Sequence, residues 1–236
     1  MPADATRTRD ARALRFVPMA ATLDRSFYEN EYHFPQDVQQ PGETRLRRAL
    51  DVLAPIDGAT FLDLGSGVGW AANLAASDGA DLAVGLDFAW RALQLGDAHI
   101  PEVARVQADG CRLPLRSASF DAVLSFGSLE HFPDVDAALR EVARILKPSG
   151  RAVMVVPNFY VRTEQPVELR LSYRGWRSRF ASAGLRITAT KADPGPAVLR
   201  DRRPTRIGIR LAAKVLAVVP RLPYQFIFGL EPAIAR

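Results

Sequence analysis

Phe-Leu-Asp-Leu-Gly-Ser-Gly-Val-Gly-Trp, residues 61–70, combines a short apolar run that carries Asp63 with three glycines at alternate positions. An Ala- and Leu-rich segment follows, so the pattern predicts a buried strand that turns through glycine into a helix. Glycine lets backbone N–H groups approach a ligand closely, and a helix N-terminus favours anionic groups. The stretch therefore predicts a nucleotide-like cofactor site at the carboxyl end of a parallel strand.

The composition is that of one good-sized globular domain with a substantial core. The chain has 236 residues, of which 48% are hydrophobic and 24% are charged; these fractions are ordinary for a globular protein. The longest apolar candidate, residues 207–219, is interrupted by Arg210 and Lys214 and does not reach spanning length. We expect no secretory leader, and Cys111 by itself forms neither an internal disulfide nor a cysteine-based metal site. We therefore expect a cytoplasmic protein.

Positive charge is concentrated in the last third of the chain. Residues 162–221 hold 14 Arg or Lys and 4 Asp or Glu, although the whole chain carries a formal charge of only +5. Such a segment is suited to an anionic membrane surface, a phosphorylated substrate or a nucleic acid. A solvated, arginine-rich surface without a partner explains the same pattern.

Strand-like and helix-like segments alternate through the middle of the chain. The predicted strands are 59–64, 82–86, 104–107, 120–126 and 151–156, and the predicted helices are 43–53, 70–77, 89–96 and 135–146. Residues 147–150, Lys-Pro-Ser-Gly, read as the turn before the last of these strands. Apolar strands separated by helices predict a parallel sheet covered by helices on both faces.

The pattern changes at both ends of this region. After Pro157 we expect a helix at 173–183, a strand at 185–191 and a final strand at 224–230. Between those two strands, 193–223 reads as a basic insertion with one apolar helix at 206–219. At the other end, residues 1–40 read as a loose arm that includes a dense aromatic segment. That segment predicts a lid in which Tyr28, Tyr32 and His33 contact the cofactor or the acceptor, although a plain hydrophobic cover of helix 43–53 is an equal alternative.

Glycine spacing alone leaves two cofactors open. Counted from Gly65, the loop has Trp70 where the dinucleotide fingerprint requires glycine or alanine. Counted from Gly67, it satisfies G-x-G-x-x-A with Ala72, and Asp87 lies 20 residues further on. A nicotinamide-dependent oxidoreductase is therefore a real alternative.

Three features outside the loop bear on this choice. Asp63 lies inside the first strand, where a buried carboxylate needs a hydrogen-bond donor; it is placed to orient loop amides or to reach a cation through water. Asp109 follows the third strand and puts a second carboxylate at the strand end next to Asp87. A polar cluster that begins at Ser125 ends the fourth strand at the same edge.

In this order and spacing, residues 61–157 resemble the class I S-adenosylmethionine-dependent methyltransferases, particularly the small-molecule branch that includes quinone-ring methyltransferases. The resemblance implies that S-adenosylmethionine is the cofactor and that no metal is required. The resemblance implies that the methionine part of the cofactor is held by Asp63, Gly65, Ser66, Gly67, Gly69 and Ser125. It implies that Asp87 binds the ribose hydroxyls. It assigns the adenine to Phe88 and to the third-strand loop with Asp109, Gly110 and Cys111.

The resemblance also implies a fold. It is a Rossmann-like three-layer α/β sandwich whose seven-stranded sheet is mostly parallel, with an antiparallel last strand and the order 3-2-1-4-5-7-6. On this basis residues 41–236 form a single methyltransferase domain with its cofactor core at 59–157.

The predicted reaction is methyl transfer to a small or lipid-like acceptor. If the acceptor must lose a proton, Glu130 and His131 after strand four are the best-placed bases; alternatively, His131 caps the following helix or packs in the wall. An RNA methyltransferase is disfavoured because Ser125-Phe-Gly-Ser replaces the Asn/Asp-Pro-Pro-aromatic motif of base-flipping enzymes. A cofactor-binding accessory protein without activity stays open. The acceptor, the oligomeric state and the role of 193–223, including contact with a membrane surface, do not follow from the sequence.

Overall fold

A computed structural model describes residues 42–100, 102–160, 168–193 and 223–233. Within these residues, seven strands form one sheet in the order β3-β2-β1-β4-β5-β7-β6. The strands are β1 (Thr60–Leu64), β2 (Leu82–Asp87), β3 (Ala104–Gln107), β4 (Phe120–Phe126), β5 (Leu146–Pro157), β6 (Leu185–Asp193) and β7 (Gln225–Pro232). Strands β1 to β5 pair in parallel, and β7 runs antiparallel to both of its neighbours. The predicted Rossmann-like order is confirmed.

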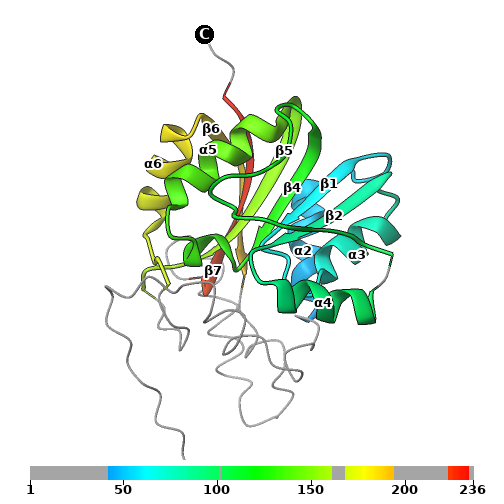
Figure 1. The fold of residues 1–236 in the computed structure, drawn as a ribbon. Coiled ribbons are helices and arrows are strands. Elements are labelled where there is room, and N and C mark those ends of the chain that lie inside the picture. Colours follow the sequence, from blue (N-terminus) through cyan, green and yellow to red (C-terminus); the bar gives the residue numbers. More distant parts are fainter. Residues whose placement is uncertain (1–41, 101, 161–167, 194–222, 234–236) are drawn as a thin grey trace, which may run out of the picture.

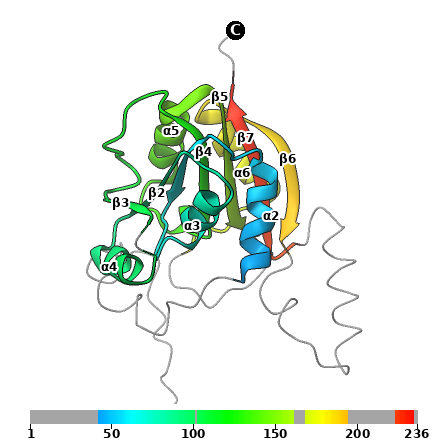
Figure 2. The same ribbon diagram turned by 90° about the vertical axis from the view of Figure 1, so that its right-hand side faces the viewer.

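Helices cover both faces of the sheet (Figure 1). One face carries α2 (Glu43–Leu53), α3 (Trp70–Ser77) and α4 (Trp90–His99), and Figure 2 looks onto α2 and α3. The other face carries α5 (Val135–Ile145) and α6 (Tyr173–Ser182). Two separate hydrophobic clusters fill the spaces between the layers, as expected when both faces of a parallel sheet are buried.

Helical periodicity explains how the covering helices pack. In α2, the four residues Leu46, Ala49, Leu50 and Leu53 recur at the spacing of one helix face, and all are buried. Five residues of α5 form a similar buried face, and the Asp134 side chain caps this helix by accepting a hydrogen bond from the Ala137 N–H at 2.9 Å.

The predicted turn at 147–150 is wrong, because β5 already begins at Leu146. Leu146 pairs with Phe120 and Arg151 pairs with Ala122, so the residues between them form a bulge in the strand. A Cβ atom at Gly150 would lie 2.9 Å from the Phe120 carbonyl oxygen. The bulge therefore requires glycine at that position, and glycine is also what made the segment resemble a turn.

Several element boundaries also differ by a few residues from those predicted. Helix α4 continues to His99, and β7 covers Gln225–Pro232 rather than 224–230. Strand β6 continues to Asp193, which we expected to begin a linker. The aromatic segment with Tyr28, Tyr32 and His33 and the expected helix at 206–219 lie outside the described residues. None of the helices in the described part of the chain is long and apolar enough to cross a membrane.

We expect Gly96→Ala to destabilise the protein by about 1–3 kcal/mol. Alanine normally favours a helix interior, but here a Cβ atom would clash with the Val68 carbonyl oxygen and lie 2.8 Å from Arg105 Nε. Urea unfolding measures the effect, with Gln94→Ala on the exposed face of α4 as the control. A stabilised Gly96→Ala variant would contradict the close approach of α4 to the glycine turn.

Candidate active site

The turn between β1 and α3 has a backbone that only glycine adopts easily. Gly65, Gly67 and Gly69 have φ angles of +73°, +55° and +96°, and Gly69 is the N-cap of α3. The N–H groups of Gly65 and Ser66 donate to the Leu86 carbonyl oxygen at 2.8 and 3.0 Å. These bonds hold the predicted cofactor loop against the carboxyl end of β2.

Asp87 is fixed beside this turn. Its Oδ2 atom accepts a hydrogen bond from the Gly67 N–H at 2.7 Å, and its Oδ1 atom accepts one from the Ala89 N–H at 2.8 Å. A carboxylate has about four lone-pair positions, so it can accept more than two hydrogen bonds, as binding of the predicted ribose hydroxyls requires. Phe88, the predicted adenine contact, is 39% exposed at the same strand end.

Asp63 is buried beneath the turn and is hydrogen-bonded to the start of α3. Its side chain is 3% exposed, and its Oδ2 atom accepts a hydrogen bond from the Ala72 N–H in the first turn of α3 at 3.3 Å. Asp63 thus orients the start of the helix. Burial raises the pKa of Asp63 to about 7, and the negative charge of Asp87 adds to the rise.

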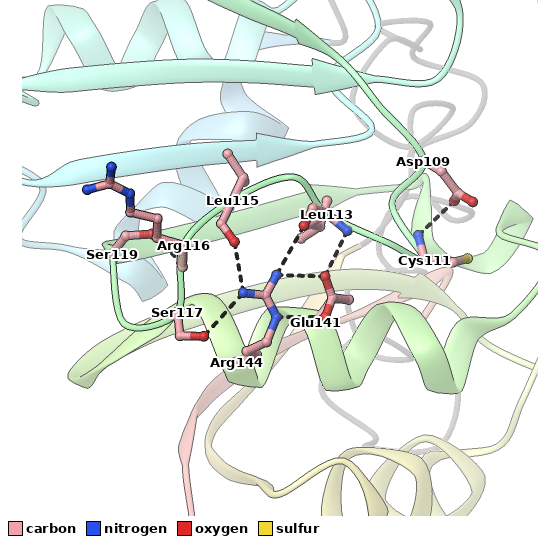
Figure 3. Close-up of polar contacts among 9 residues, drawn as sticks. All are labelled: Asp109, Cys111, Leu113, Leu115, Arg116, Ser117, Ser119, Glu141 and Arg144. Atoms are coloured by element: carbon pink, nitrogen blue, oxygen red, sulfur yellow. Dashed lines mark hydrogen bonds and ion pairs between the residues drawn. The ribbon is translucent and has the colours of Figure 1, made fainter.

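The third-strand loop presents Asp109 at the surface (Figure 3). The Asp109 Oδ1 atom accepts a hydrogen bond from the Cys111 N–H at 2.8 Å, so this N–H, which the resemblance assigned to the adenine ring, already has a partner within the loop. Gly110 is buried, and a Cβ atom there would lie 2.8 Å from Cζ of Phe132. The Cys111 thiol lies 3.3 Å from the Asp134 carbonyl oxygen, and burial raises its pKa to about 11. The thiol is therefore neutral and acts as packing.

Two side chains of α5 hold the continuation of this loop (Figure 3). Glu141 accepts a hydrogen bond from the Leu113 N–H at 2.7 Å, and Arg144 donates to the carbonyl oxygens of Leu113 and Leu115 at 3.1 and 2.8 Å. Glu141 and Arg144 also bind each other at 2.7 Å, which keeps the pKa of Glu141 below its ordinary value. Sequence reasoning missed this pair, although the i, i+3 spacing of opposite charges was its signal.

The end of β4 lies against the glycine turn. Ser128 donates from its hydroxyl to the Gly65 carbonyl oxygen at 2.7 Å, and a Cβ atom at Gly65 would lie 2.5 Å from Ser128 Cβ. Ser128 belongs to the strand-four end that the resemblance places beside the methionine, but only Ser125 of that segment was named as a site residue. The predicted residue, Ser125, is fully buried, and its hydroxyl has no hydrogen-bond partner among the described residues.

The two base candidates occupy the short 3-10 helix Leu129–His131. Glu130 is 2% exposed, and within the described ranges neither of its carboxyl oxygens has a hydrogen-bond partner. Burial raises the pKa of Glu130 to about 8. Its own backbone N–H, which does not reach hydrogen-bond geometry, lowers the pKa, and the Glu168 carboxylate adds to the rise. His131 is half-buried. It does not cap the following helix, because Asp134 does.

A buried ion pair that sequence reasoning missed lies at the same edge of the sheet. Arg45 of α2 donates from Nε to Asp193 at 3.0 Å and from Nη2 to Gln225 Oε1 at 2.7 Å. Its guanidinium carbon lies 5.1 Å from the centre of the Phe126 ring and 6.0 Å from that of Tyr224. The pair ties α2 to the ends of β4, β6 and β7.

Metal ligands do not gather in the part of the chain that is described. No group of three or more His, Cys, Asp or Glu side chains is arranged there to hold an ion.

Comparison with known proteins identifies the fold family. Residues 62–154 match the family model described as a methyltransferase domain. The demethylmenaquinone methyltransferase of Beutenbergia cavernae is 39% identical over 126 residues, which are 52% of this chain and 52% of that protein. The ubiquinone biosynthesis O-methyltransferase of Paracidovorax citrulli is 33% identical over 107 residues, 43% of this chain and 44% of that protein. The chain thus spans about half the length of the curated relatives it matches.

A solved structure extends the likeness of the fold beyond this segment. The S-adenosylmethionine-dependent methyltransferase from Mesorhizobium loti superimposes with a TM-score of 0.62 and 19% identity, covering 80% of this chain and 98% of that one. Residues 62–154 therefore match a methyltransferase domain, and the fold around them is shared with this solved structure along most of the chain.

We expect Asp63→Asn to change how stability depends on pH. The folded pKa of Asp63, about 7, lies above the ordinary value of 3.8, so the native state holds an extra proton between these values. The free energy of unfolding of the wild type therefore falls as the pH rises through this range, whereas asparagine removes that loss. Relative to the wild type, Asp63→Asn gains roughly 2 kcal/mol between pH 5 and 8 in urea unfolding. Parallel pH profiles would contradict the assignment.

We expect Arg144→Ala to loosen the loop that carries Asp109. Removing the guanidinium leaves the Leu113 and Leu115 carbonyl groups without this donor, at a cost of about 1–3 kcal/mol. Hydrogen exchange of the Leu113 N–H should accelerate in the same variant. Arg47→Ala, which removes an exposed ion pair with Asp78, is the control and should destabilise the protein much less than Arg144→Ala. Equal effects of the two substitutions would refute the bridging role of Arg144.

Proposed function

We propose that this chain, whose residues 62–154 match a methyltransferase domain, is a class I S-adenosylmethionine-dependent methyltransferase that transfers the methyl group to a small-molecule acceptor. The observation that carries the proposal is the sheet order, with antiparallel β7 inserted between β5 and β6, in a chain with this match. The relatives named as quinone and ubiquinone methyltransferases support a small, ring-bearing acceptor.

The residues at the carboxyl ends of β1, β2 and β3 fit the cofactor. The glycine turn exposes backbone beside the N-terminus of α3, which suits the carboxylate of the methionine part. Asp87 and Asp109 offer carboxylate oxygens at the carboxyl ends of the neighbouring strands β2 and β3, as the ribose and the adenine of the cofactor require. The proposed cofactor residues are Asp63, Gly65, Ser66, Gly67, Gly69, Asp87, Phe88, Asp109, Gly110, Cys111 and Ser125.

The sheet argues against the nicotinamide alternative. Dinucleotide-binding folds classically use the strand order 3-2-1-4-5-6, without an antiparallel strand inserted before the last. The Gly67 register therefore satisfies the dinucleotide fingerprint in a sheet of a different kind. No observation among the described residues favours an RNA acceptor over a small molecule, whereas the relatives favour the small molecule.

The chain contributes positioning more than reactivity. S-adenosylmethionine, when bound, supplies an electrophilic methyl group on a positively charged sulfur. The glycine turn, Asp87 and the end of β4 orient the reacting centre, and the buried edge formed by β4, β5 and β7 excludes water from the acceptor side. Contact of 193–223 with a membrane surface and a cytoplasmic location stay predictions, since most of that segment lies outside the described residues.

Calorimetric titration with S-adenosylhomocysteine tests the proposed cofactor. We expect micromolar binding by the wild type and no binding of NAD or NADP. Asp109→Ala should weaken binding about tenfold, equivalent to about 1.4 kcal/mol for one lost hydrogen bond. Asp51→Ala, on the exposed side of α2, should leave binding unchanged. Binding of NADP instead of S-adenosylhomocysteine would establish the oxidoreductase alternative.

A further inference from the structure

Buried polar side chains gather at one end of the sheet. Six polar or charged residues are buried in the described part of the chain, and all but Asp63 lie where β4, β5 and β6 end or where β7 begins. These five are Ser125, Glu130, Asn158, Asp193 and Gln225. Burying polar groups costs free energy unless they are paired, so their accumulation at one edge calls for a functional explanation.

Three of these five residues have printed hydrogen-bond partners, whereas the Ser125 hydroxyl and the Glu130 carboxyl have none among the described residues. Asn158 donates to the Pro223 carbonyl oxygen at 3.1 Å, and Asp193 and Gln225 both accept hydrogen bonds from Arg45. Both Glu130 oxygens lack a hydrogen-bond partner within the described ranges, although the residue is 2% exposed. A carboxyl group in this condition is suited to a ligand that supplies the missing hydrogen bond.

The Glu130 carboxyl lies beside Gly127, near the point where a side chain at Gly127 would begin. An ideal Cβ atom at Gly127 would lie 3.8 Å from Glu130 Oε1 and 3.7 Å from Gln225 Nε2, so both groups border the same point. Because Gln225 Oε1 is held by Arg45, its amide nitrogen is directed away from the ion pair. Ser128, two residues before Glu130, contacts the glycine turn. This point therefore lies between the proposed cofactor loop and β7.

The charged groups around Glu130 do not neutralise it. Glu168 raises its pKa further, and the Arg45 guanidinium is paired with Asp193. The Tyr224 hydroxyl on the β7 side interacts electrostatically with Arg45 and Glu130 as well as with Glu168 and Asp193, and burial raises its pKa. His131, the next residue in the chain, is half-buried.

We propose, on the basis of the function proposed above, that Glu130 binds a hydroxyl group of the acceptor and takes its proton during methyl transfer. The O–H bond breaks and its proton passes to a Glu130 oxygen. The hydroxyl oxygen bonds to the methyl carbon as the bond between that carbon and sulfur breaks, leaving the neutral thioether and a methyl ether. Glu130 then releases the proton to solvent. Gln225 Nε2 donates a hydrogen bond to an oxygen beside the reacting one.

A hydroxyl fits this carboxyl better than an amine does. An alkylammonium group would form a buried ion pair with Glu130 and so favour the carboxylate, which lowers its basicity. A neutral hydroxyl is cheaper to bury than an ammonium group and bonds to the carboxyl in either protonation state. The raised pKa of about 8 makes the Glu130 carboxylate a stronger base than an exposed glutamate, as a weakly acidic phenol or enol requires.

Glu130→Gln tests the proton transfer, because glutamine keeps the shape and loses the base. The probe is labelled S-adenosylmethionine with a small-molecule extract of the source cells, and the labelled product is identified by mass spectrometry. We expect the wild type to form a methyl ether. The kcat of Glu130→Gln should be at least about 100-fold lower than that of the wild type, and its binding of S-adenosylhomocysteine should be unchanged. Glu43→Gln, exposed on α2, is the control and should keep full activity. An N-methyl or C-methyl product, or a kcat within threefold of the wild type, would overturn the proposal.

The pH profile separates a base from a merely structural residue. We expect kcat/KM of the wild type to rise with pH around 8, and this rise should disappear in Glu130→Gln. Glu168→Gln should shift it to lower pH, since the Glu168 carboxylate raises the pKa of Glu130. Infrared difference spectra follow the same protonation without any acceptor, and an absence of a Glu130 carboxyl band titrating near pH 8 would refute the assignment. If the wild type fails to bind S-adenosylhomocysteine, the proposed function itself is wrong.

Discussion

The structure depends on the left-handed turn between β1 and α3. Gly65, Gly67 and Gly69 adopt backbone conformations that strain any other residue, so the chain reverses within a few positions. Asp87 accepts from the N–H of Gly67, while Asp63 accepts from the N–H of Ala72. These two carboxylates attach the turn to the end of β2 and to the first turn of α3. The other site elements, from the third-strand loop to the end of β4, lie around this fixed point.

Most features of the fold that depend on local sequence patterns were predicted correctly, whereas features that depend on distant contacts were not. Apolar runs and helical spacing were enough to predict the order of the helices and strands, and they placed Asp87 and Asp109 correctly at the ends of β2 and β3. The Arg45 ion pair was missed because its partners lie 148 and 180 positions away, and no local pattern links them. The sequence places Asp193 at the start of the basic insertion for the same reason: a polar residue before proline and glycine resembles a turn, and only the tertiary structure shows that it is buried.

One segment connects the two halves of the proposed site. Ser128 binds the Gly65 carbonyl, and the Phe132 ring lies against both Gly65 and Gly110. Further along, Glu141 and Arg144 hold the loop that follows Asp109. Because these residues belong to the same short stretch, a shift of α5 would displace both the methionine side and the adenine side. Glu130 lies within that stretch, so the acceptor side is built on the same support.

Asp63 and Glu130 show why a raised pKa does not by itself mark a catalytic group. Burial raises the pKa of both carboxyl groups far above ordinary values. Asp63, however, already accepts a hydrogen bond from the Ala72 N–H and stands behind the turn, so its hydrogen bond serves the fold. Glu130 is equally buried, yet its oxygens have no hydrogen-bond partner among the described residues, and its carboxyl lies beside Gly127. The same desolvation that costs stability when Glu130 ionises also makes its carboxylate basic. This basicity is useful where the substrate has a proton to transfer to the carboxylate.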